Sequence, residues 1–351
     1  MGRLRGSIAA LIAGALLVLP IAPAQADEEA DAVGTEAARE TASVSVPVRM
    51  VPGPPPYRGA NGLVEIRLGN SPAIPVAIDT GFSGLVLFPG ALAGSVAGVR
   101  RTGDAISVVR SDGSKIPGAK AQATLTLNGI QSVVPVPFIV SNSDSPVFAS
   151  WRRAGARGLL GVGTKGNNAM VNPLSTLPGN LGLRYSIHFE RNATDRGGRN
   201  GALVLGAEAP TDPTMVFQLQ STGTDLYGAN VWNDHAAPGC WTFGTGRAQC
   251  VPTTFDAAFN IMRAKGPIAR RIQTQGPGLA RPGTRVSLSS PTSAFTGWTF
   301  AAGRTGSANV VKVLKGRSAV NTGNAVFFDF TVTYNLVTGR IYLSDPMRKA
   351  G

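Results

Sequence analysis

The sequence of 351 residues contains only two cysteines and two histidines, which limits the kinds of site that it can build. Two cysteines without a nearby pair of histidines do not make a zinc site. The Gly-x-Ser-x-Gly motif of Ser-His-Asp hydrolases is absent as well. His188 lies in an apolar, strand-like segment and His235 in a loop, so we expect a structural role for the first and a solvated position for the second. We therefore expect no metal and no cofactor.

Long apolar runs are absent after residue 26, so no later segment is expected to span a bilayer. Residues 1–26 combine the basic Arg3 and Arg5, an apolar run from Ile8 to Ile21 and the small-residue end Ala24-Gln25-Ala26. This pattern is typical of a secretory signal peptide that is removed after Ala26. We expect the mature protein to be soluble and secreted into the extracellular space.

Export favours a disulfide between the two cysteines, Cys240 and Cys250, which are separated by nine residues in a hairpin-like context. Acidic residues are missing from Arg263 to Arg317, where we count ten Lys or Arg and no Asp or Glu. No recognition helix or aromatic-interleaved RNA-binding signature accompanies these bases, so we expect no nucleic-acid partner. A solvated face accounts for them most simply, and an anionic cell-envelope surface is the alternative.

Composition divides the chain into five parts. After the signal peptide, residues 27–56 are first acidic and then Pro-rich, which predicts a disordered leader or propeptide. Short apolar or alternating runs separated by Gly and Asn turns then predict an all-β protein, with lobes at 57–211 and 212–346 and a tail at 347–351. Phe255 to Ala264 has helical apolar spacing and predicts the one clear helix. The excess of Arg over Lys (26 against 7) is typical of a GC-rich bacterial genome.

One acid stands out in the first lobe. The apolar run from Ile74 to Ile78 leads into Asp79, the turn Thr80-Gly81 follows, and Leu85 to Phe88 forms a second apolar run. A carboxylate at such a strand end lies near backbone N–H groups and away from bulk water. This is a suitable position for a general acid or base.

This stretch resembles the active-site loop of the pepsin-like aspartic peptidases. Leu159-Leu160-Gly161 resembles the hydrophobic-hydrophobic-Gly segment that threads behind this loop, and Gly323 to Leu343 resembles the terminal strands of the family. The resemblance implies a monomeric, bilobal, mainly β fold with a cleft between the lobes. It also implies that Asp79, Thr80 and Gly81 are catalytic-loop residues, and that the cleft binds an extended peptide segment by β-type pairing.

The second half of the implied active site departs from the family pattern. The expected Asp-Thr-Gly should precede the helix predicted at Phe255, and the best match is Gly244-Thr245-Gly246, with Gly244 in the position of the acid. Asp234 and Asp256 are the nearest acids, and neither precedes a Thr-Gly or Ser-Gly pair. The segment Asn321-Thr322-Gly323 corresponds to the second hydrophobic-hydrophobic-Gly segment, with both apolar positions lost.

Two further residues differ from the family pattern. Phe82 replaces the Ser or Thr that hydrogen-bonds the first aspartate, and Arg110 stands in the hairpin where the flap Tyr is expected. Two close carboxylates share a proton, which separates their roles into acid and base, and a lone Asp79 lacks this help. We therefore interpret the protein as a catalytically impaired, inhibitor-like relative that binds peptides.

Two alternatives remain open. The protein is an active aspartic endopeptidase if a second carboxylate, from Asp234, Asp256 or another chain, pairs with Asp79. It is a cell-envelope-binding protein if the basic stretch from Arg263 to Arg317 is its working surface.

Overall fold

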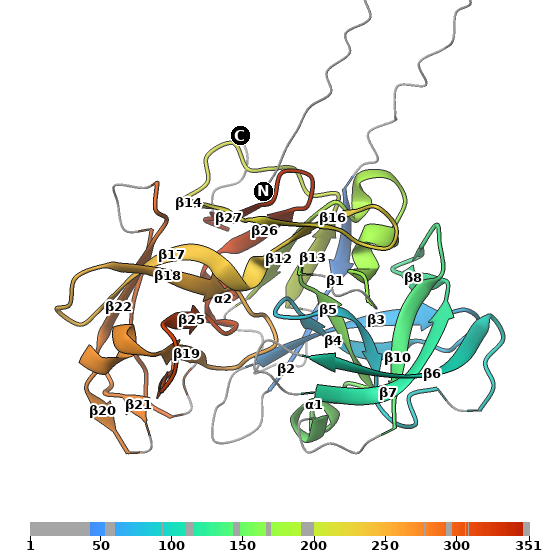
Figure 1. Ribbon diagram of the computed structural model, residues 1–351, viewed down its shortest axis with the longest axis horizontal. Helices are drawn as coiled ribbons and strands as arrows, with labels where there is room; N and C mark the ends of the chain where they lie inside the picture. Colours follow the sequence, from blue (N-terminus) through green and yellow to red (C-terminus); the bar gives the residue numbers. More distant parts are fainter. Residues whose placement is uncertain are drawn as a thin grey trace, which may run out of the picture. The chain divides into compact units, whose positions relative to one another are not determined.

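The computed structural model describes residues 43–52, 60–92, 94–109, 115–142, 148–165, 170–190, 200–276, 278–292, 297–305, 307 and 309–346. The predicted signal peptide, the leader residues 27–42 and 53–56, and the tail at 347–351 lie outside these ranges. The described chain is built mainly from β-strands (Figure 1), so the predicted all-β class is confirmed. No helix in the described ranges is long and apolar enough to cross a membrane.

The first half of the chain forms a sheet that has ten strands within the described residues. Its central strands β4, β5 and β11 are buried along almost their whole length, as expected for apolar strands covered on both faces. In Figure 1 these strands run from blue to green. The members are β2 (Arg49–Pro52), β3 (Ala60–Leu68), β4 (Ile74–Asp79), β5 (Ser83–Leu87), β6 (Val99–Val109), β7 (Lys115–Ala123), β8 (Leu125–Leu127), β9 (Ile130–Gln131), β10 (Val136–Ser141) and β11 (Gly158–Val162).

The second half forms a corresponding sheet with nine strands in the described ranges, drawn from yellow to red in Figure 1. Its core includes Trp241, Phe243 and Leu288, all of which are buried. The members are β17 (Ala237–Phe243), β18 (Gln249–Thr254), β19 (Met262–Lys265), β20 (Thr274–Gln275), β21 (Leu279–Ala280), β22 (Arg285–Ser289), β23 (Trp298–Ala301), β24 (Val311–Leu314) and β25 (Ala319–Asn321).

A third sheet joins strands from both halves in the order β1-β13-β12-β26-β27-β14. Its central ladder pairs β12 with β26, and a separate hairpin is formed by β15 and β16. These strands are β1 (Val44–Pro47), β12 (Arg184–Phe189), β13 (Gly201–Leu205), β14 (Met215–Gln218), β15 (Ser221–Thr224), β16 (Asn230–Trp232), β26 (Thr331–Asn335) and β27 (Arg340–Ser344). Short helices connect them: α1 (Ala149–Arg153), α2 (Ala325–Asp329) and the 3₁₀ turns η2 (Pro173–Thr176), η3 (Gly179–Leu181), η4 (Asp234–Ala236) and η5 (Pro267–Arg271).

The two large sheets repeat one strand arrangement. In the first, β11 runs parallel to β4 and antiparallel to β5, and β10 runs parallel to β5. In the second, β25 runs parallel to β18 and antiparallel to β19, and β24 runs parallel to β19. The loop between β18 and β19 therefore corresponds to the loop between β4 and β5, which carries Asp79.

The register identifies the matching residue within that loop. Asp79 lies opposite Gly161 in the ladder between β4 and β11. Thr254 lies opposite Asn321 at the end of the ladder between β18 and β25, and counting two residues beyond it matches Asp256 with Gly323. A side chain would not fit at either glycine: a Cβ on Gly161 would lie 2.2 Å from the Phe82 ring, and one on Gly323 would lie 2.6 Å from a backbone oxygen.

Two sequence predictions differ from this structure. Residues 44–47 and 49–52 form β1 and β2, although 27–56 was predicted to be a disordered leader; β1 pairs with β13, and β2 pairs with β3. Their apolar side chains Val46, Val48 and Met50 are buried in the core, which explains why this end of the segment is ordered. The helix predicted from Phe255 to Ala264 is instead a loop followed by β19.

Candidate active site

Thr80 connects the two matching loops. Its hydroxyl donates a hydrogen bond to the backbone oxygen of Phe255 and accepts one from the backbone N–H of Ala257, each over 2.8 Å. These two residues flank Asp256, so the residue after one aspartate holds the backbone on both sides of the other. We call this pair of contacts the Thr80 bridge. It is fully buried, and it brings the loops of Asp79 and Asp256 together.

The two aspartates are held in the same way by their own loops. Asp79 Oδ1 accepts a hydrogen bond from the backbone N–H of Gly81 at 3.0 Å, and Asp256 Oδ1 accepts one from that of Ala258 at 3.1 Å. Both side chains are 0% exposed. A buried carboxylate is stable only when hydrogen bonds compensate for the lost water, and each loop supplies one such bond from its own backbone.

Asp256 has a further partner that comes from the segment behind its loop. The side-chain amide of Asn321 donates to Asp256 Oδ2 at 2.7 Å, while Asn321 Oδ1 accepts from the backbone N–H of Gly323 at 2.9 Å. An amide donor favours the ionised form of the carboxyl group that it contacts. The polar residue that replaces an apolar position in Asn321-Thr322-Gly323 therefore takes part in the site.

Tyr334 contacts the same backbone oxygen as the Thr80 bridge. Its hydroxyl donates to the backbone oxygen of Phe255 at 3.2 Å, and its ring stacks on that of Tyr185 with the centroids 5.1 Å apart. Burial raises the pKa of Tyr334 well above the ordinary tyrosine value; a hydrogen bond with Thr80 opposes the rise, and the negative charges of Asp234, Asp256 and Asp79 add to it. Three carboxyl groups thus act on one buried hydroxyl.

The third of these acids, Asp234, occupies a different position from the matched pair. It belongs to η4, and its Oδ2 accepts a hydrogen bond from the backbone N–H of Thr164, just after β11. Burial raises the pKa of its carboxyl group, while His235 and the N–H groups of Thr164 and Lys165 oppose the rise. Of the two acids weighed as partners for Asp79, Asp256 is the one whose loop the Thr80 bridge holds.

The segment Gly244-Thr245-Gly246 lies elsewhere. It forms the exposed turn between β17 and β18, and Gly244 has a φ of +60°, which suits a tight turn. The structure therefore places the matching loop about ten residues further along the chain than the sequence comparison did. Arg110, the flap candidate, lies outside the described residues.

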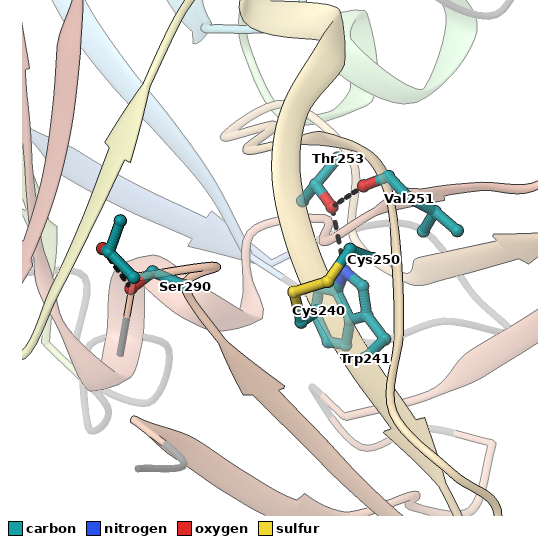
Figure 2. Close-up of a disulfide and its surroundings, with 7 residues drawn as sticks. Cys240, Trp241, Cys250, Val251, Thr253 and Ser290 are labelled. Atoms are coloured by element: carbon teal, nitrogen blue, oxygen red, sulfur yellow. Dashed lines mark hydrogen bonds between the residues drawn. A yellow bond between two sulfur atoms is a disulfide. The ribbon is translucent and has the colours of Figure 1, made fainter. Parts of the chain in front are cut away.

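The predicted disulfide between Cys240 and Cys250 is confirmed. It joins directly opposite residues of β17 and β18 (Figure 2). Next to it, the indole N–H of Trp241 donates to the hydroxyl of Thr253 at 2.9 Å. These contacts fix the strand that leads directly into Asp256.

The histidines had different outcomes. His188 Nδ1 lies 3.3 Å from the backbone oxygen of Phe330, which agrees with the structural role predicted for it. The prediction of a solvated His235 was wrong, because its Nε2 lies 3.0 Å from the backbone oxygen of Gly81 and the residue is mostly covered. The sequence signal for Asp256 was weak: it is an acid after the β-type run Val251 to Phe255, but the Thr-Gly pair that usually follows a catalytic aspartate is missing.

Comparison with known proteins supports the fold. No family model matches the chain, and no curated protein sequence matches it. Among solved structures, the chain is similar to the aspartic proteinase from Irpex lacteus, with a TM-score of 0.56 and 16% sequence identity over 87% of this chain and 97% of that one. This likeness shows the fold alone. The chain therefore has the all-β, bilobal fold of a pepsin-like aspartic proteinase.

Proposed function

We propose that the protein is a secreted aspartic endopeptidase whose two catalytic carboxyl groups are Asp79 and Asp256. The observation that carries the proposal is the Thr80 bridge, which joins the two loops at the residues next to both acids. The proposal adopts the alternative in which a second carboxylate pairs with Asp79, and it assigns that carboxylate to Asp256 rather than to Asp234. The fold and the disulfide are compatible with an extracellular protein.

The chemistry follows from placing two carboxyl groups in one site. When they share a proton, the ionised one takes a proton from water and the protonated one polarises the carbonyl of the peptide bond. The amide contact from Asn321 favours the ionised form of Asp256, which suits the role of base. The substrate is an extended peptide segment bound in the cleft between the lobes.

A second candidate is the peptide-binding protein that has lost catalysis. It is favoured by the asymmetry of the site: Ala257 has no hydroxyl in the position that corresponds to Thr80, and Phe82 replaces a hydrogen-bonding residue beside Asp79. In this case the cleft binds peptides, and the two aspartates only maintain the loops. The two candidates make opposite predictions for hydrolysis.

The first prediction concerns the catalytic pair. At acidic pH the purified protein should degrade denatured casein, and Asp79→Asn and Asp256→Asn should each lower kcat by at least ~10²–10⁴-fold, because each removes one member of the acid–base pair. Glu208→Gln serves as the control, since it neutralises an exposed carboxylate and should keep the wild-type rate.

A further control tests the other assignment of the second site. Gly244→Asp introduces an acid in the exposed turn, where no atom lies within 4 Å of an added Cβ, and it should change the rate little. Wild-type hydrolysis by Asp256→Asn would disprove the proposed pair. No hydrolysis by the wild type, together with binding of a statine-type transition-state mimic, would favour the second candidate.

A further inference from the structure

His235 reaches the loop of Asp79 from the second half of the chain. It belongs to η4, and its Nε2 lies 3.0 Å from the backbone oxygen of Gly81, two residues after Asp79. A carbonyl oxygen only accepts hydrogen bonds, so Nε2 must carry the hydrogen in this contact. The imidazole therefore donates to the same turn whose N–H holds Asp79 Oδ1.

Asp234, the preceding residue, attaches η4 to a second loop of the first half. Its Oδ2 accepts a hydrogen bond from the backbone N–H of Thr164. The neighbouring Gly163 leaves room for this carboxylate, because a Cβ there would lie 3.0 Å from Oδ2. Its Oδ1 has no hydrogen-bond partner among the described residues and lies 3.7 Å from His235 Nε2. The carboxyl group is 2% exposed and the imidazole 26% exposed, so the carboxyl group lies buried beside the ring.

A side chain of the first aspartate loop ties the two loops together. The Thr80 bridge runs from the first loop to the second. Residue 257 follows Asp256 as Thr80 follows Asp79, so a hydroxyl there could make the reciprocal bridge to the first loop. Residue 257 is alanine, which has no hydroxyl. The Asp79 loop therefore lacks the tie that a threonine at this position would give it, and His235 is a donor from the second half that reaches this loop.

We propose that His235, carried by the η4 turn that Asp234 attaches to the first half, is a positioning residue that replaces the missing half of this tie and holds the turn of Asp79 in its reactive arrangement. The role depends on the peptidase function proposed above, because it is defined by the pairing of Asp79 with Asp256. His235 touches neither the substrate nor the reacting water; it acts through the backbone at Gly81.

The decisive experiment combines His235 with Ala257. His235→Phe keeps a ring but loses the donor, and it should lower kcat by about 10- to 100-fold with a smaller change in KM, because a displaced carboxylate costs reaction rate rather than binding. His235→Gln retains a side-chain N–H that can reach Gly81, and it should restore most of this loss. Ala257→Thr should raise the kcat of His235→Phe at least severalfold, and by a larger factor than it changes the kcat of the wild type.

The double variant separates positioning from general stability. A purely structural role for His235 predicts that Ala257→Thr gives the same change in either background, and that result would overturn the proposal. An unchanged kcat in His235→Phe would overturn it as well. Melting temperatures of all four proteins, measured under the assay conditions, show whether a loss of rate merely follows unfolding.

Amide hydrogen exchange provides a readout that does not depend on catalysis. In His235→Phe the peptide that spans Ile78 to Gly84 should exchange faster than in the wild type, and Ala257→Thr should slow it again. If Asp256→Asn keeps full activity but this exchange pattern appears, the proposed function fails while the contact stands. If both aspartates are essential and the exchange of this peptide is unchanged, the positioning role fails alone.

Discussion

The residues that follow the two aspartates differ in what they must supply. The N–H at Gly81 and at Ala258 bonds the preceding carboxylate in each loop, and any residue other than proline offers such a group. A backbone group cannot replace the hydroxyl of Thr80, since this one oxygen atom both donates a hydrogen bond to Phe255 and accepts one from Ala257. Loss of Thr-Gly beside Asp256 therefore removes the recognisable motif and one hydroxyl, but it keeps the hydrogen bond to the acid.

Asp234 makes the stability of the protein depend on pH. Burial raises the pKa of its carboxyl group, so the folded state binds this proton more tightly than the unfolded chain does. The resulting stabilisation is fully present below the ordinary carboxyl pKa and is lost as the pH rises through the raised value. Asp234→Asn removes this titration, so the melting temperature of the wild type relative to the variant should fall as the pH rises above the ordinary carboxyl pKa of about 4.

The neighbours of Asp234 define the control for that measurement. His235 is adjacent, and Tyr185 and Tyr334 lie within its electrostatic reach. His235→Gln removes the imidazole and leaves the carboxyl group in place, so the fall relative to Asp234→Asn should persist in that background. A pH-independent difference between the wild type and Asp234→Asn would contradict the prediction.

At the level of elements, β18 determines where the second aspartate lies. The sequence was sufficient to find Asp79, the segment Leu159-Leu160-Gly161 and the disulfide, because each combines local apolar runs or cysteines with a simple spacing. It was insufficient for Asp256, since the matching loop is defined by strand pairing with β25, and pairing across 67 residues leaves no local signal. Thr245-Gly246, in the turn before β18, has the residues of the motif but lies in a different loop.

The helical spacing from Phe255 to Met262 also has a physical explanation. Phe255 and Ala258 in the loop and Met262 at the start of β19 are all buried. An irregular loop between two buried strands can repeat apolar residues every three or four positions without helical hydrogen bonds. Periodicity alone therefore could not distinguish it from a short helix.

The disulfide should contribute directly to the stability of this hairpin. It closes a loop between residues ten apart, so replacing both Cys240 and Cys250 by serine should lower the free energy of unfolding by about 2–3 kcal/mol. Urea denaturation followed by tryptophan fluorescence measures the change, since Trp241 is buried beside the bridge. Reduction of the wild type should produce the same loss, and an unchanged midpoint in both cases would contradict the expectation.

On the scale of the whole molecule, one long stretch of the second half, Arg263 to Arg317, carries positive charges and no acid. The basic stretch from Arg263 to Arg317 includes η5, where Arg270 and Arg271 are both exposed, and it begins with Arg263 stacked 3.8 Å from the centre of the Phe259 ring. Such a surface attracts anionic polymers or acidic peptides at low ionic strength. The partner itself remains a prediction from charge.

We expect the protein to bind an immobilised anionic polymer and to elute with salt, because exposed charges are screened at high ionic strength. Arg270→Gln combined with Arg271→Gln should lower the eluting salt concentration. Arg100→Gln with Arg101→Gln provides the matched control, since this is also an exposed neighbouring pair but lies in the first half. Equal shifts for the two double variants would show that net charge, and not this surface, governs the binding.

The shared sheet has a consequence for the continuity of the chain. The polypeptide passes from its first half to its second between Leu205 and Met215. The halves are also joined by the antiparallel pairing of β12 with β26, in which Arg184 to Ile187 lie opposite Asn335 to Val332. Both chain ends of the described fold, at β1 and β27, belong to this same sheet. We therefore expect the two halves to stay associated when the peptide link between them is cut. The architecture is suited to fragment complementation and to circular permutation at 206–214, with each fragment bringing one aspartate.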